Sequence, residues 1–268
     1  FVPLSPVSFV ERSAEVFGGR PAVIHGARRY TWAQLRERSA RLAAALRAGG
    51  VGRGSTVSLM LPNTPEMVEA HYAVPALGAV LNTLNTRLDA ALLAWQMNHC
   101  EAQVLITDRE YAPVMREALH QLRTEHQRSI TVIDVCDSEY TGDGETLGTL
   151  EYESLLLAHG PLARLDGPVD EWDAIAVSYT SGTTGEPRGV MLTHRAFTFE
   201  LDSLESFLPV SPDDSSLCFL PLSHSLERAW TFFVLAHGCL NTYVPDARTV
   251  AEMMVKAEPT MLVRVPRL

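Results

Sequence analysis

Several familiar nucleotide and hydrolase fingerprints are absent from this chain of 268 residues. The Walker pattern needs a glycine, four residues and then Gly-Lys-Ser/Thr, and no such spacing occurs. The dinucleotide pattern Gly-x-Gly-x-x-Gly and the serine-hydrolase elbow Gly-x-Ser-x-Gly are also missing. The sequence therefore offers no support for a P-loop NTPase, a Rossmann dehydrogenase or a serine hydrolase.

Metal-binding and redox motifs are lacking as well. The four cysteines, at positions 100, 136, 218 and 239, are widely spaced and include no Cys-x-x-Cys pair. The histidines form no His-x-x-x-His pair and no array with acidic residues that would suit a metal. We therefore predict free thiols in a reducing compartment, a cytoplasmic location and no metal site held by protein ligands alone.

Basic clusters and long apolar runs are scarce. The formal net charge is −10 and no stretch concentrates Lys and Arg, so a nucleic-acid partner is not expected. No run approaches the ~20 apolar residues of a membrane-spanning helix. The start, Phe1-Val2-Pro3-Leu4-Ser5-Pro6, has no signal-peptide pattern. Peripheral contact with a membrane surface stays compatible with this composition, which is otherwise that of a globular protein.

One loop is rich in hydroxyl groups and glycines: residues 179–189 read Tyr-Thr-Ser-Gly-Thr-Thr-Gly-Glu-Pro-Arg-Gly, between apolar runs at 174–177 and 190–192. Glycines let backbone N–H groups approach an anion, hydroxyls donate further hydrogen bonds, and Arg188 adds a permanent positive charge. This composition predicts a phosphate-binding loop. The alternative is an ordinary polar turn between two strands. The candidate phosphate-binding residues are Thr180, Ser181, Gly182, Thr183, Thr184, Gly185, Arg188 and Gly189.

Strand-like and helix-like segments alternate along the chain. Thr31 and Gln34 form a capping box before a helix that Gly49 ends, and Asp89 caps another helix. Strands are expected at 56–61, 79–83, 104–106, 130–133, 174–177, 217–220, 240–244 and 261–263. Further helices are expected from about 66, and at 112–122, 195–207, 226–235 and 250–256, with an acidic loop at 136–145. This alternation predicts an α/β fold with layered, largely parallel sheets flanked by helices.

Two strings carry a family resemblance. Residues 179–189 resemble the phosphate-binding signature of the adenylate-forming, or AMP-binding, superfamily, which includes the acyl-CoA synthetases; Arg188 stands where that family usually has Lys. Pro221-Leu222-Ser223-His224-x-x-Glu-Arg-x-Trp is similar to a stretch that lines the acyl and nucleotide pockets of long-chain acyl-CoA synthetases. The resemblance implies that His224 is a candidate catalytic residue near the substrate carboxylate and that Trp230 binds substrate.

The residues alone permit plainer interpretations of this second string. His224 could be a helix-capping or core histidine, and Glu227 and Arg228 could form a surface ion pair worth little.

The resemblance covers the whole chain. The part through Thr180 looks like medium-chain enzymes, and the part after Gly189 looks closer to long-chain ones, so a recombined origin is one explanation. We expect residues 1–268 to be an incomplete N-terminal AMP-binding domain, with a front subdomain at 1–170 and the phosphate-loop region and start of the next subdomain at 171–268. The family's Tyr-Gly-x-Thr-Glu segment, ribose-binding Asp and small C-terminal domain with its Lys are not in this sequence.

For the full-length parent, the resemblance implies ATP-dependent conversion of a medium- or long-chain fatty acid to acyl-AMP and then acyl-CoA. ATP, coenzyme A and the fatty acid would be the partners, with Mg²⁺ arriving on ATP. One alternative is an acyl-AMP ligase that supplies a carrier protein. Another, which we expect for this chain by itself, is a truncated nucleotide-binding domain without turnover. Apolar surface bared by truncation predicts self-association.

Overall fold

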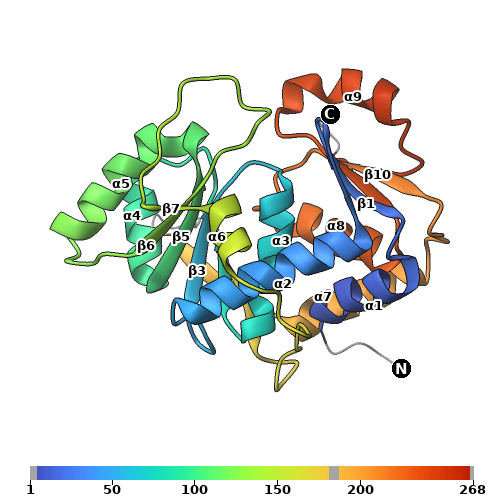
Figure 1. The fold of residues 1–268 in the computed structure, drawn as a ribbon, viewed down its shortest axis with the longest axis horizontal. Helices are drawn as coiled ribbons and strands as arrows, with labels where there is room; N and C mark the ends of the chain where they lie inside the picture. Colours follow the sequence, from blue (N-terminus) through green and yellow to red (C-terminus); the bar gives the residue numbers. More distant parts are fainter. Residues whose placement is uncertain (1–4, 181–186, 266–268) are drawn as a thin grey trace.

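The computed structural model describes residues 5–180 and 187–265, and these residues form two β-sheets with helices packed around and between them (Figure 1). The strands are β1 (Pro21–His25), β2 (Arg28–Thr31), β3 (Thr56–Met60), β4 (Val80–Thr83), β5 (Ala102–Asp108), β6 (Thr131–Val135), β7 (Leu150–Glu151), β8 (Ala174–Thr180), β9 (Arg188–Thr193), β10 (Ser215–Cys218) and β11 (Leu240–Tyr243). The helices are α1 (Val7–Phe17), α2 (Trp32–Ala48), α3 (Pro65–Ala73), α4 (Ala90–His99), α5 (Ala112–Thr124), α6 (Tyr152–Ala158), α7 (His194–Glu205), α8 (Ser225–Ala236) and α9 (Val250–Ala257).

The larger sheet has seven strands in the order β7-β6-β5-β3-β4-β8-β9. All of its neighbouring pairs are parallel except the last, in which β9 runs antiparallel to β8. Parallel strands bring their carboxyl ends to one edge, where sites gather in α/β folds. The predicted α/β fold with largely parallel sheets is therefore confirmed.

The smaller sheet joins distant parts of the chain. Its order is β10-β11-β1-β2, so two strands from the second half of the chain lie beside a hairpin from its beginning. Both sheets contain strands from either side of residue 170, so no sheet ends at that boundary. The division into subdomains at 170 stays a prediction.

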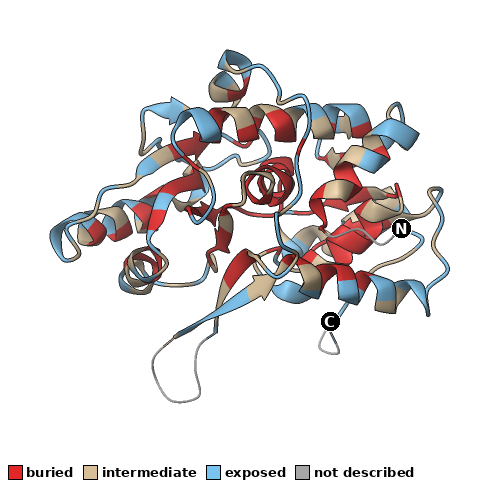
Figure 2. Cartoon of the chain, turned by 90° about the horizontal axis from the view of Figure 1, so that it is seen from below, coloured by how far each residue is buried: buried red, intermediate tan, exposed pale blue. Residues whose placement is uncertain are grey.

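Helices α3 and α8 lie in the middle of the molecule, between the two sheets (Figure 1). All nine residues of α3 are buried, including Glu66, Glu69 and His71, and the burial view shows this buried centre (Figure 2). A helix buried on every side needs partners for its polar groups. Glu66 and Glu69 obtain them from Arg28 and Arg38.

Most of the predicted elements are confirmed with shifted ends. The capping box at Thr31 and Gln34 and the cap at Asp89 are present as predicted. The predicted strand at 261–263 is wrong, because Met261 makes only an isolated bridge to Ser216. Pro259, which cannot donate to a ladder, stands just before it. The sequence patterns did not indicate α1, β1, β2, α6 or β7.

Candidate functional site

Strands β8 and β9 form a hairpin on either side of the predicted phosphate loop. Thr180 and Arg188 form the last residue pair of the hairpin before the loop, and both residues are exposed. The hairpin extends away from the body of the molecule (Figure 2). Ser181, Gly182, Thr183, Thr184 and Gly185 lie outside the described residues. The flanking strands suit a phosphate-binding loop and a plain polar turn equally, so the role of the loop stays a prediction.

The hairpin is packed closely one residue pair from the loop, where Gly189 lies opposite Tyr179. A Cβ atom on Gly189 would lie 3.2 Å from Cγ2 of Val177 and 3.3 Å from Cε1 of Tyr179, so a larger residue would push against both neighbours. The Tyr179 hydroxyl lies 2.8 Å from Nδ1 of His99, whose ring stacks on Trp95. Burial raises the pKa of Tyr179. These contacts hold the strand that enters the loop, and no sequence signal indicated Trp95 or His99.

Strand β4 connects the hairpin to the segment that carries His224. It pairs with β8, with Asn82 opposite Val177. At its carboxyl end, the Thr83 hydroxyl donates to the carbonyl of Ser223 at 3.3 Å and accepts from Nη2 of Arg228 at 2.5 Å. The structure therefore brings the strand entering the loop and the His224 segment to the same edge of the seven-stranded sheet, which their separation in sequence does not reveal.

His224 stands between β10 and α8, as the residue preceding the helix. Its backbone N–H donates to the carbonyl of Pro221 at 2.9 Å, and its carbonyl accepts from the N–H of Arg228 at 3.2 Å. The residue is exposed, and its side chain forms no capping hydrogen bond. The backbone of His224 is thus fixed while the ring is accessible to a ligand.

Trp230 occupies a different environment. Its side chain belongs to the main hydrophobic core, and its indole N–H donates to the Ser216 hydroxyl at 2.9 Å. The ring also packs against Phe233, with centroids 5.5 Å apart. These contacts account for the tryptophan as a core residue, and its substrate-binding role stays a prediction.

Glu227 and Arg228 are not a surface ion pair, because both side chains are buried. The Glu227 carboxyl accepts from the N–H of Leu220 at 3.2 Å, and burial raises its pKa to about 8. Arg228 points instead toward Thr83, and burial lowers its pKa to about 10. The surface interpretation fails because α8 lies between the sheets, which the local sequence does not show.

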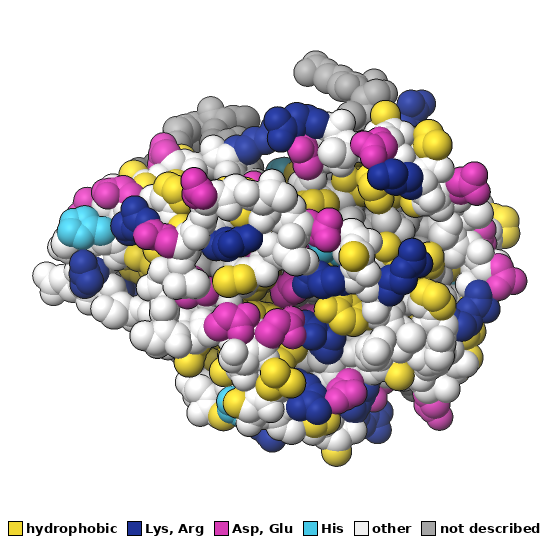
Figure 3. Space-filling view, turned by 45° about the horizontal axis from the view of Figure 1, so that its top comes forward, with side chains coloured by type: hydrophobic (Ala, Val, Ile, Leu, Met, Phe, Trp, Pro, Cys, Tyr) yellow, Lys and Arg dark blue, Asp and Glu magenta, His cyan; other side chains and the backbone are white. Residues whose placement is uncertain are grey.

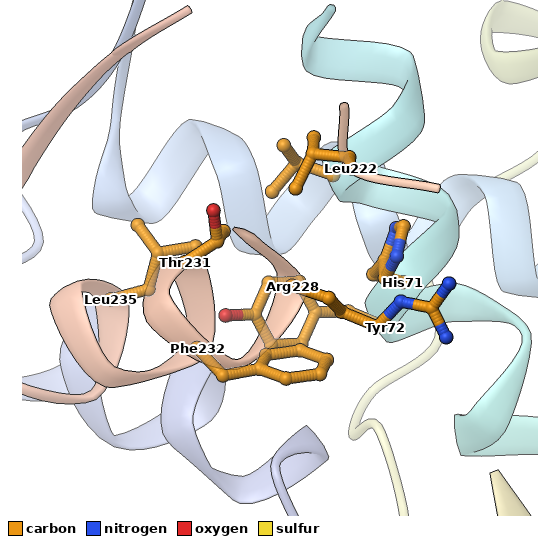
Figure 4. Close-up of a pocket in the computed structure, with 8 residues that line it drawn as sticks. His71, Tyr72, Leu222, Arg228, Thr231, Phe232 and Leu235 are labelled. Atoms are coloured by element: carbon orange, nitrogen blue, oxygen red, sulfur yellow. The ribbon is translucent and has the colours of Figure 1, made fainter. Parts of the chain in front are cut away.

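A small cavity lies between α3 and α8 (Figure 4). The space between its lining side chains amounts to about 190 Å³, including some that is open to solvent, and no part of it is wide enough for a water molecule. Its walls include Val68, Leu222 and Phe232, together with the polar groups of His71 and Arg228. The ring of His71 donates from Nδ1 to the Met67 carbonyl at 2.6 Å, and burial together with the charge of Arg228 lowers its pKa to about 3. His71 is therefore neutral at physiological pH.

Residues 5–180 and 187–265 show neither a metal-binding cluster nor a membrane-spanning helix. No group of three or more His, Cys, Asp or Glu side chains in these ranges is arranged to hold a metal ion. Across the same ranges, every helix is too short or too polar to cross a membrane. The face shown in Figure 3 carries acidic and basic side chains interspersed with apolar ones.

Comparisons with known proteins give a consistent result. The family model described as AMP-binding enzyme matches residues 10–268. An Arabidopsis thaliana acetate/butyrate–CoA ligase, named as peroxisomal, is 34% identical over 275 residues, which cover 99% of this chain and 48% of the relative. A peroxisomal benzoate–CoA ligase of the same species is 37% identical over 237 residues, covering 86% of this chain and 40% of the relative.

The solved structures agree on the fold. The crystal structure of the anthranilate CoA ligase AuaEII in complex with anthranoyl-AMP superposes with a TM-score of 0.86 at 21% identity, covering 97% of this chain and 50% of that one. The chain thus spans about half the length of the relatives that it matches.

Proposed function

The chain belongs to the AMP-binding enzyme family, and on that premise we propose that it supplies the phosphate-binding half of an acid–thiol ligase. In the proposed reaction a carboxylate attacks the α-phosphate of ATP and displaces pyrophosphate, which gives an acyl-adenylate. The thiol of coenzyme A then attacks the acyl carbon and releases AMP. An acyl-AMP ligase that supplies a carrier protein would share the first step and differ in the second.

One observation carries this proposal. The exposed pair Thr180 and Arg188, at the mouth of the hydroxyl- and glycine-rich loop, and the exposed His224 stand at the same sheet edge, linked through Thr83 on β4. An adenylation site needs an anion-binding loop next to a group that can orient a carboxylate. Catalysis of phosphoryl chemistry rests mainly on such positioning and on electrostatic stabilisation.

The proposed roles follow from the side chains. The hydroxyl of Thr180 would donate to a phosphate oxygen, and Arg188 would offset charge on the outer phosphates as pyrophosphate leaves. His224 would donate to the acid and hold its carboxylate toward the α-phosphate. We propose that Mg²⁺ arrives with ATP and is bound mostly by the phosphates, which it neutralises.

For the substrate we propose a monocarboxylic acid, with a medium- or long-chain fatty acid as the first choice. The names of the two relatives extend the range to be tested to acetate, butyrate and benzoate. A cytoplasmic location stays part of the proposal, to be checked by imaging, because both of these relatives are named as peroxisomal.

We further propose that the 268-residue chain by itself binds nucleotide without completing the adenylation step. Carboxylate-dependent exchange of labelled pyrophosphate into ATP, across acids from acetate to palmitate, tests this. Exchange by the chain would show that these residues suffice for adenylation and would overturn this part of the proposal.

Nucleotide binding is tested by calorimetric titration of the chain with Mg-ATP. Loss of one charge-assisted contact costs about 1.5–3 kcal/mol, so Arg188→Ala should weaken binding by about tenfold to a hundredfold. Arg188→Lys should restore much of the affinity. Arg248→Ala is the matched control, because that exposed arginine pairs only with Asp246 in the described structure. Equal affinities in all four proteins would contradict the phosphate role of the hairpin.

A further inference from the structure

The backbone from Leu220 to His224 is held by buried side chains from separate parts of the chain. The amide of Asn63, in the turn after β3, donates to the carbonyl of Leu220 at 2.8 Å and accepts from the N–H of Leu222 at 3.0 Å. Its side chain therefore makes the pair of hydrogen bonds that a neighbouring strand would make. The backbone groups of Leu220 and Leu222 are thus satisfied as they would be in a β-sheet, although no described strand lies beside them there.

The other end of the segment is held from β4 and α8. The carbonyl of Ser223 accepts from the Thr83 hydroxyl at 3.3 Å and from Nη2 of Arg228 at 3.4 Å. Because Arg228 also donates to Thr83, the three groups form a closed triangle of hydrogen bonds immediately before His224. We call the side chains of Asn63, Thr83 and Arg228 the loop clamp.

The energetics of Arg228 separate the loop clamp from ordinary core packing. The guanidinium is buried, no acidic side chain forms an ion pair with it among the described residues, and its Nε and Nη1 have no hydrogen-bond partner there. A buried charge without an opposite charge costs stability, so an apolar side chain of similar size at this position would remove that cost. What Arg228 contributes is the orientation of Thr83 and of the Ser223 carbonyl.

We propose that the loop clamp positions the ring of His224. Its consequence for catalysis rests on the proposed function. In such a reaction, displacing a reacting group by about 1 Å can cost about a hundredfold in rate. The residues of the loop clamp do not touch the substrate in this proposal. They act only through the backbone that ends at His224.

The test uses the 268-residue chain with ¹⁵N-labelled histidine and no added ligand. The ring signals of His224 are assigned by their loss in His224→Gln, and their titration midpoint and line width are measured. Hydrogen exchange of the peptide spanning 219–225 is followed in parallel, because the N–H groups of Leu220, Leu222 and His224 all donate hydrogen bonds.

We expect Thr83→Val to move the His224 signals and to speed exchange of this peptide by about fivefold, as for the loss of one buried hydrogen bond. Thr83→Ser, which keeps the hydroxyl, should return both readouts to the wild-type values. Arg228→Met should change both readouts while leaving the melting temperature equal or higher. If Arg228→Met does not fold, the Thr83 pair still decides the question.

Asn241→Ala is the matched control, because this buried amide donates to the Tyr243 hydroxyl at 3.1 Å, and the side-chain hydrogen bond that it makes does not involve residues 220–224. It should lower stability without moving the His224 signals. Unchanged signals and exchange in Thr83→Val would overturn the proposal, and so would equal changes in Asn241→Ala. Because no nucleotide is added, failure of ATP binding would refute the proposed function and leave this result intact.

Discussion

Asp137 joins the two sheets, and replacing it tests that connection. It follows β6 of the seven-stranded sheet, and its carboxylate accepts from Nε2 of His25 at 2.9 Å and from Nη2 of Arg28 at 2.8 Å. His25 and Arg28 belong to the four-stranded sheet, and Arg28 also pairs with Glu66 on α3. We predict that Asp137→Asn, which keeps the shape and removes the charge, loosens the contact between the sheets.

The size of the effect follows from the burial of the group. Only 3% of the Asp137 side chain is exposed, and removing one partner of a buried ion pair costs about 3–5 kcal/mol. Arg28 is partly exposed and keeps Glu66 as a partner, so the lower end, about 3 kcal/mol, applies. For a chain of this length that corresponds to a fall in melting temperature of about 6–12 °C.

The pH dependence gives a second criterion. Burial acts to raise the pKa of Asp137, but hydrogen bonding and charge from His25, with the charge of Arg28, outweigh it and leave the pKa lowered. A carboxyl group whose pKa is lower in the folded state stabilises the protein above its unfolded pKa, near 3.8, and loses that contribution as the pH falls further. The difference between wild type and Asp137→Asn should therefore shrink below about pH 4.

Urea denaturation followed by circular dichroism at pH 7 and pH 3.5 measures both criteria. Asp246→Asn is the control, because its ion pair with Arg248 is exposed and should leave stability unchanged. A loss below about 1 kcal/mol at pH 7 would refute the reasoning, since it would match an exposed pair. A difference that is the same at both pH values would contradict the assigned role of the charge.

Three further predictions concern other contacts. Burial lowers the pKa of His71 to about 3. Below about pH 6.5 the unfolded chain therefore binds a proton on this histidine that the folded chain does not. The free energy of unfolding should fall by up to about 1.4 kcal/mol for each pH unit below 6.5. His71→Phe should flatten this slope in urea titrations between pH 7 and pH 5, and an unchanged slope would exclude the assignment. Ser216→Ala, which leaves the buried N–H of Trp230 without its acceptor, should cost about 1–3 kcal/mol in the same assay, and a neutral result would argue against that hydrogen bond. In the described part of the chain β9 is the outer strand of its sheet and Met191 is 74% exposed, so Met191→Lys should reduce self-association in light scattering. A wild-type chain that stays monomeric at all concentrations would remove the basis for that expectation.

Local sequence signals predicted much of this structure. The capping box at Thr31 and the cap at Asp89 depend on residues within one helical turn, so they can be recognised without knowing the fold. The apolar run at 174–177 predicted the strand that enters the loop. The family was indicated by a continuous string of residues, and the family model confirms it.

Other features could not be predicted from the sequence, because their partners are distant. The ring of His25 contacts Asp137, and its strand pairs with β11, more than 200 residues away in sequence. Strands β1 and β2 are both short, and β2 has few apolar residues. Periodicity therefore gave little signal for either strand. Glu227 and Arg228 suggested a surface ion pair, but both are buried. Their exposure depends on what covers α8, which the local sequence does not show.

The sequence by itself therefore determined the class of fold, the phosphate-loop signature and the identity of the groups available for chemistry. These follow from residue types and short spacings, which act through local hydrogen bonding and side-chain character. Tertiary structure alone decided that β4 would bring Thr83 between the loop-bearing strand and His224. It also decided that Arg228 would be buried against that contact, because α8 is enclosed between two sheets, and the smaller of them joins strands from the beginning and the later part of the chain.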